Sequence, residues 1–185
     1  MVVYAAACAG QQTQNIEVAR STLTVRAYKS GLLSGFAHDH TIAGKIAQGS
    51  IRTGDSPAVE LEIAAADLKV IDPELAADKR AEVQQRMLGS DVLDAQRFPR
   101  ILFHSTSVQP DGNNRWRVQG ELTLHGQNQP IAFSVSKSGE SYVGRATLKQ
   151  RAFGIKPVSI AGGTVKVKDE VVVEFSIIAA ESSDH

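Results

Sequence analysis

The chain has 185 residues, 42% of them apolar and 22% charged, and its twenty basic and twenty acidic side chains cancel. This length and composition predict one globular domain with a sizeable core rather than two domains. A neutral chain has no overall field that attracts nucleic acid or an acidic membrane, and no apolar run is long enough to span a bilayer. We therefore expect no nucleic-acid partner and no transmembrane segment.

Residues 1–19 are expected to form an N-terminal tail. Ala5, Ala6 and Ala7 precede Cys8, the only cysteine, and this order resembles the end of an export signal. The segment is either a small-residue cleavage site or a lipobox whose cysteine becomes a lipid anchor. It lacks a basic flank and is short, which also fits a frayed terminus. An export signal predicts a periplasmic or secreted protein, or a lipoprotein, with residues 11–14 as a polar linker.

Residues 20–181 are expected to form the domain, and most of them alternate between apolar and polar side chains with period two. In the last run, for example, Val171, Val173 and Phe175 share one phase, and Glu174 and Ser176 share the other. Such alternation predicts strands with one buried face, and short turn-rich links between them predict antiparallel neighbours. Eight strands are expected, which favours an up-and-down barrel or a sandwich. Their ranges are 21–29, 40–52, 58–66, 100–109, 115–125, 129–137, 141–150 and 164–179.

One amphipathic helix is expected near residues 73–88. Asp72 is a suitable N-cap, Pro73 suits the first helical position, and Gly89 is a natural stop. The apolar stripe of this helix is thin, with Val83 and Met87 at its centre. A helix of this kind lies on a surface with one stripe buried, and across the end of a barrel it would serve as a lid.

Few residues could carry chemistry. His38 and His40 are two positions apart, so on a strand both imidazoles share one face, and His104 or His125 could complete a metal site. The alternative is that one of the pair bonds the backbone and the other faces water. Asp169 falls in the inward phase of the last strand, where it marks a bulge or pairs with an arginine. No serine elbow, phosphate-binding loop or paired carboxylate assembles into a catalytic site.

Several segments together resemble the YceI-like family of polyisoprenoid-binding proteins. The resemblance covers about residues 20–180, and its motifs are specific in their order and spacing rather than singly. They are Gly35-Phe36-Ala37-His38-Asp39-His40, Leu93-Asp94-Ala95-Gln96-Arg97-Phe98-Pro99, Val118-Gln119-Gly120-Glu121-Leu122, Arg151-Ala152-Phe153-Gly154 and Val167-Lys168-Asp169-Glu170-Val171. The His38-Asp39-His40 segment departs from the pattern of many relatives, which have a single histidine followed by apolar residues.

The resemblance implies an eight-stranded, lipocalin-like antiparallel barrel that carries or senses a lipid and needs no catalytic group, metal or cofactor. The expected ligand is a long-chain isoprenoid, polyprenyl or quinone-like, or another small amphiphilic lipid, and a homodimer is implied as well. Small inward residues, Gly120, Gly144 and Ala146, are expected to leave room for it. A metal-dependent protein or enzyme using His38 and His40, or a filled barrel for protein interaction, are the alternatives. The predicted lining is Leu23, Val25, Phe36, Leu61, Ile63, Ile101, Phe103, Trp116, Val118, Leu122, Phe133, Phe153, Val171, Val173 and Phe175.

Overall fold

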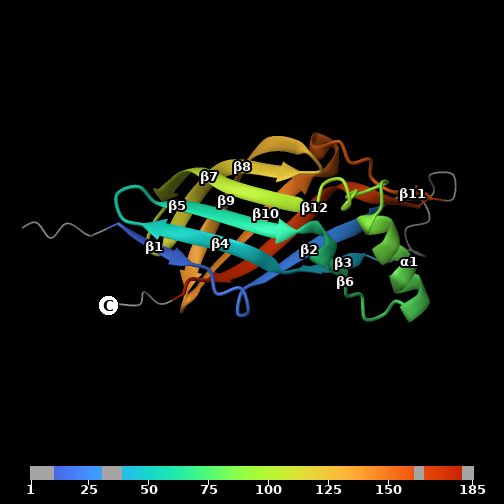
Figure 1. The fold of residues 1–185 in the computed structure, drawn as a ribbon, viewed down its shortest axis with the longest axis horizontal. Helices are drawn as coiled ribbons and strands as arrows, with labels where there is room; N and C mark the ends of the chain where they lie inside the picture. Colours follow the sequence, from blue (N-terminus) through green and yellow to red (C-terminus); the bar gives the residue numbers. More distant parts are fainter. Residues whose placement is uncertain (1–10, 31–38, 161–164, 181–185) are drawn as a thin grey trace, which may run out of the picture.

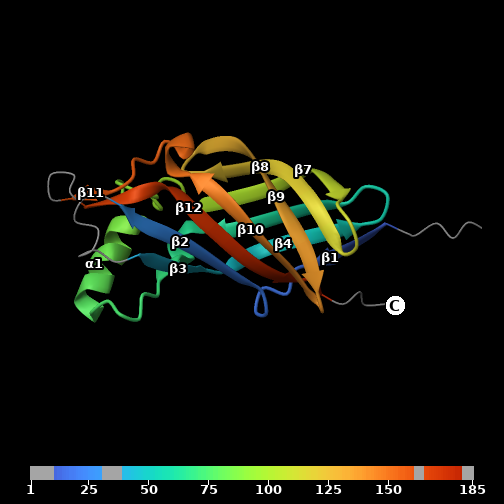
Figure 2. The same ribbon diagram turned by 180° about the vertical axis from the view of Figure 1, so that it is seen from behind.

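The computed structural model describes residues 11–30, 39–160 and 165–180. These residues form one curled antiparallel sheet, and helix α1 lies at one end of the elongated molecule, with the β4–β5 turn at the other end (Figures 1 and 2). The predicted fold class, an antiparallel all-β barrel with one helix, is confirmed. Among the described residues, no helix is both long and apolar enough to cross a bilayer.

The described part of the chain holds twelve strands and one α-helix, α1 (Ala77–Leu88). The strands are β1 (Gln12–Asn15), β2 (Thr22–Ser30), β3 (His40–Gly44), β4 (Ile46–Thr53), β5 (Ala58–Ala64), β6 (Lys69–Val70), β7 (Arg100–Pro110), β8 (Arg115–Leu124), β9 (Gln127–Ser138), β10 (Ser141–Lys149), β11 (Ser159–Ile160) and β12 (Val165–Ile178). Short 3-10 turns follow β5 and β10, at Ala65–Asp67 and Gln150–Phe153.

The sheet curls until its two ends are joined by the chain itself. Its strand order is β1-β4-β5-β7-β8-β9-β10-β12-β2-β3-β6, with β11 paired to β12. Strands β3 and β4 therefore lie near opposite ends of this path, although only Lys45 separates them in the sequence. A register shift between Ile46 and Gln48 marks a bulge, which bends a strand. One bent segment thus pairs with β2 before the bend and with β5 after it.

The predicted number of eight strands is wrong for two reasons. The expected strand 40–52 divides at Lys45 into β3 and β4. The prediction missed this division because the alternation of side chains gives no sign of a bend. The short strands β1, β6 and β11 carry too few residues for a period of two to be recognised. Residues 11–14, expected as a linker, contribute to β1, which pairs with β4, and Ile16 is buried directly after it.

The helix begins later than predicted. Residue Ala76 occupies the N-cap without a side-chain hydrogen bond, and Asp72 is not a cap at all. Instead the Asp72 carboxylate accepts hydrogen bonds from β3, and residues 73–75 form a turn before the helix begins. The predicted end of the helix is confirmed, because the Gly89 N–H closes the last turn on the carbonyl oxygens of Gln85 and Arg86.

A second correction concerns the turn between β8 and β9. The predicted strands 115–125 and 129–137 leave residues 126–128 as the link, but β9 already begins at Gln127, and Pro130 lies within the strand opposite Glu121. The reversal is a two-residue hairpin, because His125 and Gly126 both adopt positive φ, 51° and 71°. Two successive positive φ values give the twist that joins antiparallel strands most directly.

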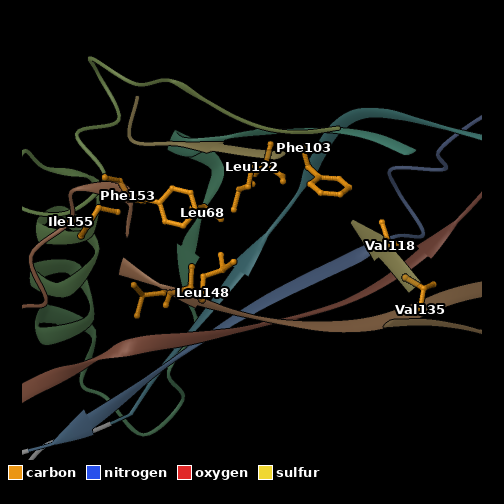
Figure 3. Packing of buried hydrophobic residues seen from close by; sticks show 12 residues of the cluster. Leu68, Phe103, Val118, Leu122, Val135, Leu148, Phe153 and Ile155 are labelled. Carbon is orange, nitrogen blue, oxygen red and sulfur yellow. The ribbon is translucent and has the colours of Figure 1, made fainter. Parts of the chain in front are cut away.

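The main core cluster lies inside the curled sheet. It includes Phe103, Leu122 and Leu148, and Figure 3 shows such residues converging from strands that are distant in sequence. A second cluster, Ile16, Ile46, Ile51 and Ile177, lies where β1 and β12 meet β4. The alternation predicted from the sequence therefore has one common inward face, and the interior of the main cluster is where a ligand site must be sought.

Candidate ligand-binding cavity

A cavity of about 1020 Å³ lies inside the curled sheet. Small-molecule sites in proteins reach about 300–1,000 Å³, so this space is large for a domain of this length. Its walls come from the inward faces of the strands around the sheet, and helix α1 contributes Val83 and Met87 at one end. The helix therefore covers one end of the cavity, in the position predicted for a lid.

The structure places nearly all of the predicted lining residues in this wall. The exceptions are Phe36, which lies outside the described residues, and Phe153. The Phe153 side chain belongs to the main core cluster and is only 2% exposed, so the core encloses it instead of the cavity. Contact with a ligand stays a prediction for the others. They are Leu23, Val25, Leu61, Ile63, Ile101, Phe103, Trp116, Val118, Leu122, Phe133, Val171, Val173 and Phe175.

Sequence reasoning missed a set of wall residues on short or irregular elements. Ile42 on β3 and Val70 on β6 line the cavity, as do Leu75 before α1 and Ile155 after the second 3-10 turn. Their elements are too short for side-chain alternation to reveal an inward face. Only the thin apolar stripe of the helix gave a usable signal, through Val83 and Met87.

The small inward residues do not all leave space. A Cβ atom on Gly120 would lie 2.4 Å from the backbone oxygen of His104 and 2.5 Å from the Phe103 ring. A Cβ atom on Gly144 would likewise lie in contact with Phe175, closer than atoms can approach. The expectation that these two glycines make room for a ligand is therefore wrong, because neighbouring rings already cover them. Ala146, by contrast, lines the cavity.

Aromatic rings form the middle of the wall. The Phe133 ring lies 5.4 Å from Phe103 and 5.5 Å from Phe175, measured between centroids, in tilted and edge-on arrangements. Two of these rings rest on the glycines just described. Offset and edge-to-face contacts of this kind are favourable beyond the burial of area. This aromatic group, Phe103, Phe133 and Phe175, is therefore a rigid part of the wall without polar atoms.

The end of the cavity beneath α1, called the helix end below, is different because it contains a hydrogen-bonded acid–imidazole pair. His40 lies in the cavity wall, and its Nδ1 atom is 2.7 Å from Asp72 Oδ2. The second carboxylate oxygen, Oδ1, accepts the backbone N–H of Thr41 at 2.6 Å. Only 7% of the Asp72 side chain is exposed, so the carboxylate itself is largely shielded from water.

Charged side chains are also concentrated at the helix end. Lys29, Lys79, Arg86 and Lys166 line it together with one acid, Glu82. The Glu82 carboxylate accepts a hydrogen bond from Lys79 Nζ at 3.0 Å. This hydrogen bond, together with the electrostatic attraction of the carboxylate, raises the pKa of Lys79. Lys79 therefore stays charged and already has a partner.

The opposite end, called the turn end, is formed by the β4–β5 and β7–β8 hairpins. Arg52, Pro57 and Pro110 line it, with Trp116 and Tyr142 nearby in the wall. The Arg52 Nε atom donates to the carbonyl oxygen of Ser56, 2.9 Å away, so this guanidinium is hydrogen-bonded within the β4–β5 turn. The cavity therefore has a charged helix end and a largely uncharged turn end.

The histidines do not gather into a metal site within the described residues. His40 bonds Asp72, whereas the exposed His104 is 3.8 Å from Glu121 on the outer face. His125 lies at the β8–β9 turn and contacts the carbonyl oxygen of Phe153 at 3.1 Å. No group of three metal-binding side chains occurs in the described ranges, and His38 lies outside them. Whether one of the pair bonds the backbone stays a prediction, because His38 lies outside the described residues, and His40 itself bonds a carboxylate.

Asp169 combines the two explanations offered for it. The pairing of β12 with β2 shifts register between Val167 and Val171, so a bulge surrounds this residue. Its Oδ1 atom also accepts the backbone N–H of Arg151 at 2.9 Å, with the Arg151 guanidinium 4.0 Å away. The bulge turns the carboxylate toward the chain that follows β10, and this explains an acid in the inward phase.

Comparison with known proteins supports a common family. The model of the YceI-like domain family matches residues 15–179. A UPF0312 protein from Vibrio cholerae is 30% identical over 123 residues, covering 60% of this chain and 64% of that protein. A UPF0312 protein from Shewanella oneidensis is 31% identical over 104 residues, covering 51% and 54%. The matched part thus spans less than two thirds of the length of these curated relatives.

Solved structures share the fold. BcnA from Burkholderia cenocepacia aligns with a TM-score of 0.68 at 19% identity, covering 89% of this chain and 99% of that chain. A polyisoprenoid binding domain from Saccharophagus degradans, implicated in plant cell wall breakdown, aligns with a TM-score of 0.60 at 13% identity, covering 89% and 96%. Identities this low show a similar architecture alone.

Proposed function

Because the chain belongs to the YceI-like domain family, we propose that it binds one extended amphiphilic lipid of the isoprenoid type inside the curled sheet. The protein carries or senses this lipid and does not transform it. The cavity of about 1020 Å³ with its aliphatic and aromatic wall is the observation on which the proposal rests. The polyisoprenoid-binding function of the Saccharophagus degradans domain with the same fold supports it.

The physical argument concerns what an apolar cavity can hold. Its wall offers water few hydrogen-bonding partners, and apolar cavities stay dry and accept apolar guests. Each methylene group moved from water into such a wall gains about 0.8 kcal/mol, so an extended prenyl chain accumulates a large gain before the cost of ordering it. A cavity with one charged end and one largely uncharged end also suits an amphiphile, because the two ends of such a ligand differ in the same way.

The arrangement at the helix end does not by itself make an enzyme. The His40–Asp72 pair resembles two members of a catalytic triad, but within the described residues no hydroxyl or thiol is hydrogen-bonded to the second ring nitrogen of His40. Catalysis by such a pair needs a nucleophile or an activated water held in place. We therefore propose that the pair serves binding.

The test uses Trp116, the only tryptophan, which lines the cavity near its turn end. Titration with geranylgeraniol is expected to change the Trp116 fluorescence and to saturate at one molecule per chain. Ala146→Leu places a larger side chain inside the wall and is expected to weaken binding at least tenfold. Ala132→Leu is the matched control, because Ala132 is exposed on β9 and does not line the cavity.

The outcomes are distinct. Saturable binding that Ala146→Leu weakens and Ala132→Leu leaves intact supports a ligand in the cavity. If geranylgeraniol binds both variants and the wild type equally, the ligand lies elsewhere. If the wild type binds none, the carrier proposal fails. Circular dichroism of each variant confirms that the sheet is retained.

We also propose, from the sequence, that the domain acts in the periplasm or outside the cell, with Cys8 as a lipid anchor. Cys8 lies outside the described residues. Fractionation of cells that express the natural gene, followed by mass spectrometry of the N-terminal peptide, tests this proposal. A cytoplasmic protein with an unmodified Cys8 would contradict it.

The proposed homodimer is tested by light scattering of the purified protein, where a monomeric mass would contradict the proposal.

A further inference from the structure

We propose that the His40–Asp72 pair recognises a hydroxyl group at the polar end of the ligand, with His40 Nε2 accepting the hydrogen bond. This inference rests on the proposed function and deepens it, because it names the chemical class of the head group. The ligand would be a prenyl alcohol, phenol or quinol rather than an ether, a hydrocarbon or a phosphate ester.

The position of the pair allows it to meet a ligand. His40 begins β3, and two residues later Ile42 is buried on the same face in the main core cluster. Both side chains line the cavity. Asp72 lies in the segment between β6 and α1, so the pair ties β3 to the connection that leads into the helix. With 23% of its side chain exposed, His40 borders the cavity while Asp72 lies behind it.

The hydrogen bonds of Asp72 fix the tautomer of His40. A carboxylate oxygen only accepts hydrogen bonds, so the Nδ1 atom 2.7 Å from Asp72 Oδ2 must carry the proton. In the neutral imidazole the Nε2 atom then has a lone pair and no proton. The carboxylate behind the ring also makes Nε2 a stronger acceptor, as it does for histidines in metal and catalytic sites. The Nε2 atom can therefore accept a hydrogen bond from a ligand that carries a donor.

That acceptor has no protein partner within the described part of the chain, where only the Nδ1 atom of His40 is hydrogen-bonded. A partly buried acceptor without a donor is unfavourable, and a ligand hydroxyl group would supply the donor. A phosphate monoester fits less well, because its oxygens would meet a lone pair with a carboxylate behind it. Of the cations that line this end of the cavity, Lys79 on α1 is already bonded to Glu82.

The replacement Asp72→Asn reverses the tautomer and so gives a sharp test. The backbone N–H of Thr41, 2.6 Å from Oδ1, can only donate, so the amide oxygen of the asparagine must take that position. The amide NH₂ group then faces His40 Nδ1 and donates to it. The proton of the imidazole moves to Nε2, which becomes a donor. Such a tautomer change is the known consequence of the same replacement in serine proteases.

The experiment compares geranylgeraniol with its methyl ether, which accepts hydrogen bonds but donates none, and follows Trp116 fluorescence at equal solubility. The wild type is expected to bind the alcohol about threefold to tenfold more tightly, the ratio that one net hydrogen bond gives. In Asp72→Asn this ratio is expected to fall to about one because the ether gains affinity. In His40→Phe it is expected to fall to about one because the alcohol loses affinity.

These outcomes separate the two proposals. If alcohol and ether bind the wild type equally, the head-group inference is overturned while the carrier function stands. If neither binds, both are overturned. Tighter binding of geranylgeranyl phosphate than of the alcohol would show an anionic head group and would also overturn the inference. A His40→Phe variant that does not fold leaves the Asp72→Asn result decisive, since asparagine keeps both hydrogen bonds of position 72.

Discussion

The aromatic middle of the cavity and its helix end are built on different principles. In the middle, Phe103 covers Gly120 and Phe175 covers Gly144, so large and small residues on neighbouring strands fill one another's space. At the helix end, His40 and Asp72 come from separate segments and meet through one 2.7 Å contact. In the proposed function, the middle would set the width available to a hydrocarbon chain, whereas the helix end would select the polar group of the ligand.

The largest effect is expected where the middle has no spare room. Gly120→Ala places a Cβ atom 2.4 Å from the backbone oxygen of His104, which cannot move without disturbing β7. Overpacking costs about 1–3 kcal/mol and occasionally more, so we expect a loss of stability at the upper end of this range. Urea denaturation of the variant measures it. An unchanged midpoint would show that the Phe103–Gly120 contact is loose.

A smaller loss of stability is expected at the helix end. Asp72→Ala leaves the Thr41 N–H and the His40 Nδ1–H without acceptors. A buried donor without a partner costs about 1–3 kcal/mol, and we expect a total near the lower end of this range because water can reach His40. Asp72→Asn is the control, because it restores a partner to both. If the alanine and asparagine variants unfold at the same denaturant concentration, the two hydrogen bonds contribute nothing to the fold.

The smallest effect is expected from the attachment of the helix. Gln84 on α1 accepts the Val70 N–H and donates to the Leu68 carbonyl oxygen, both at 2.8 Å. Gln84→Ala removes these two bonds, worth about 1 kcal/mol together once the better helix propensity of alanine is subtracted. Faster amide exchange at Val70 and faster release of geranylgeraniol are expected. Gln85→Ala, on the exposed side of the helix, should change neither.

Sequence reasoning succeeded where one strand carries its own signal. The alternation in β12 and β8 placed Val173, Phe175 and Val118 in the wall, because a period of two is local and survives any register. It failed where a property depends on two segments. Gly120 is small in the sequence, yet the Phe103 ring from another strand occupies its space.

The His40–Asp72 pair lay beyond sequence reasoning for the same reason. Asp72 precedes Pro73 and a run of helix formers, and this local context favours a helix cap. Only the pairing of β3 with β6 brings residue 72 to His40, thirty-two positions earlier in the chain. The metal alternative likewise depended on His40 and His104, whose side chains lie on different faces of the sheet in the folded protein.

The most direct test of a lipid-filled cavity is native mass spectrometry of the purified protein with geranylgeraniol added. The account predicts a single additional species, heavier by the mass of one geranylgeraniol, that the Ala146→Leu variant loses and the Ala132→Leu variant keeps. A protein that retains its unliganded mass at every lipid concentration, or that binds several molecules without saturation, would contradict the claim that the cavity holds one extended lipid.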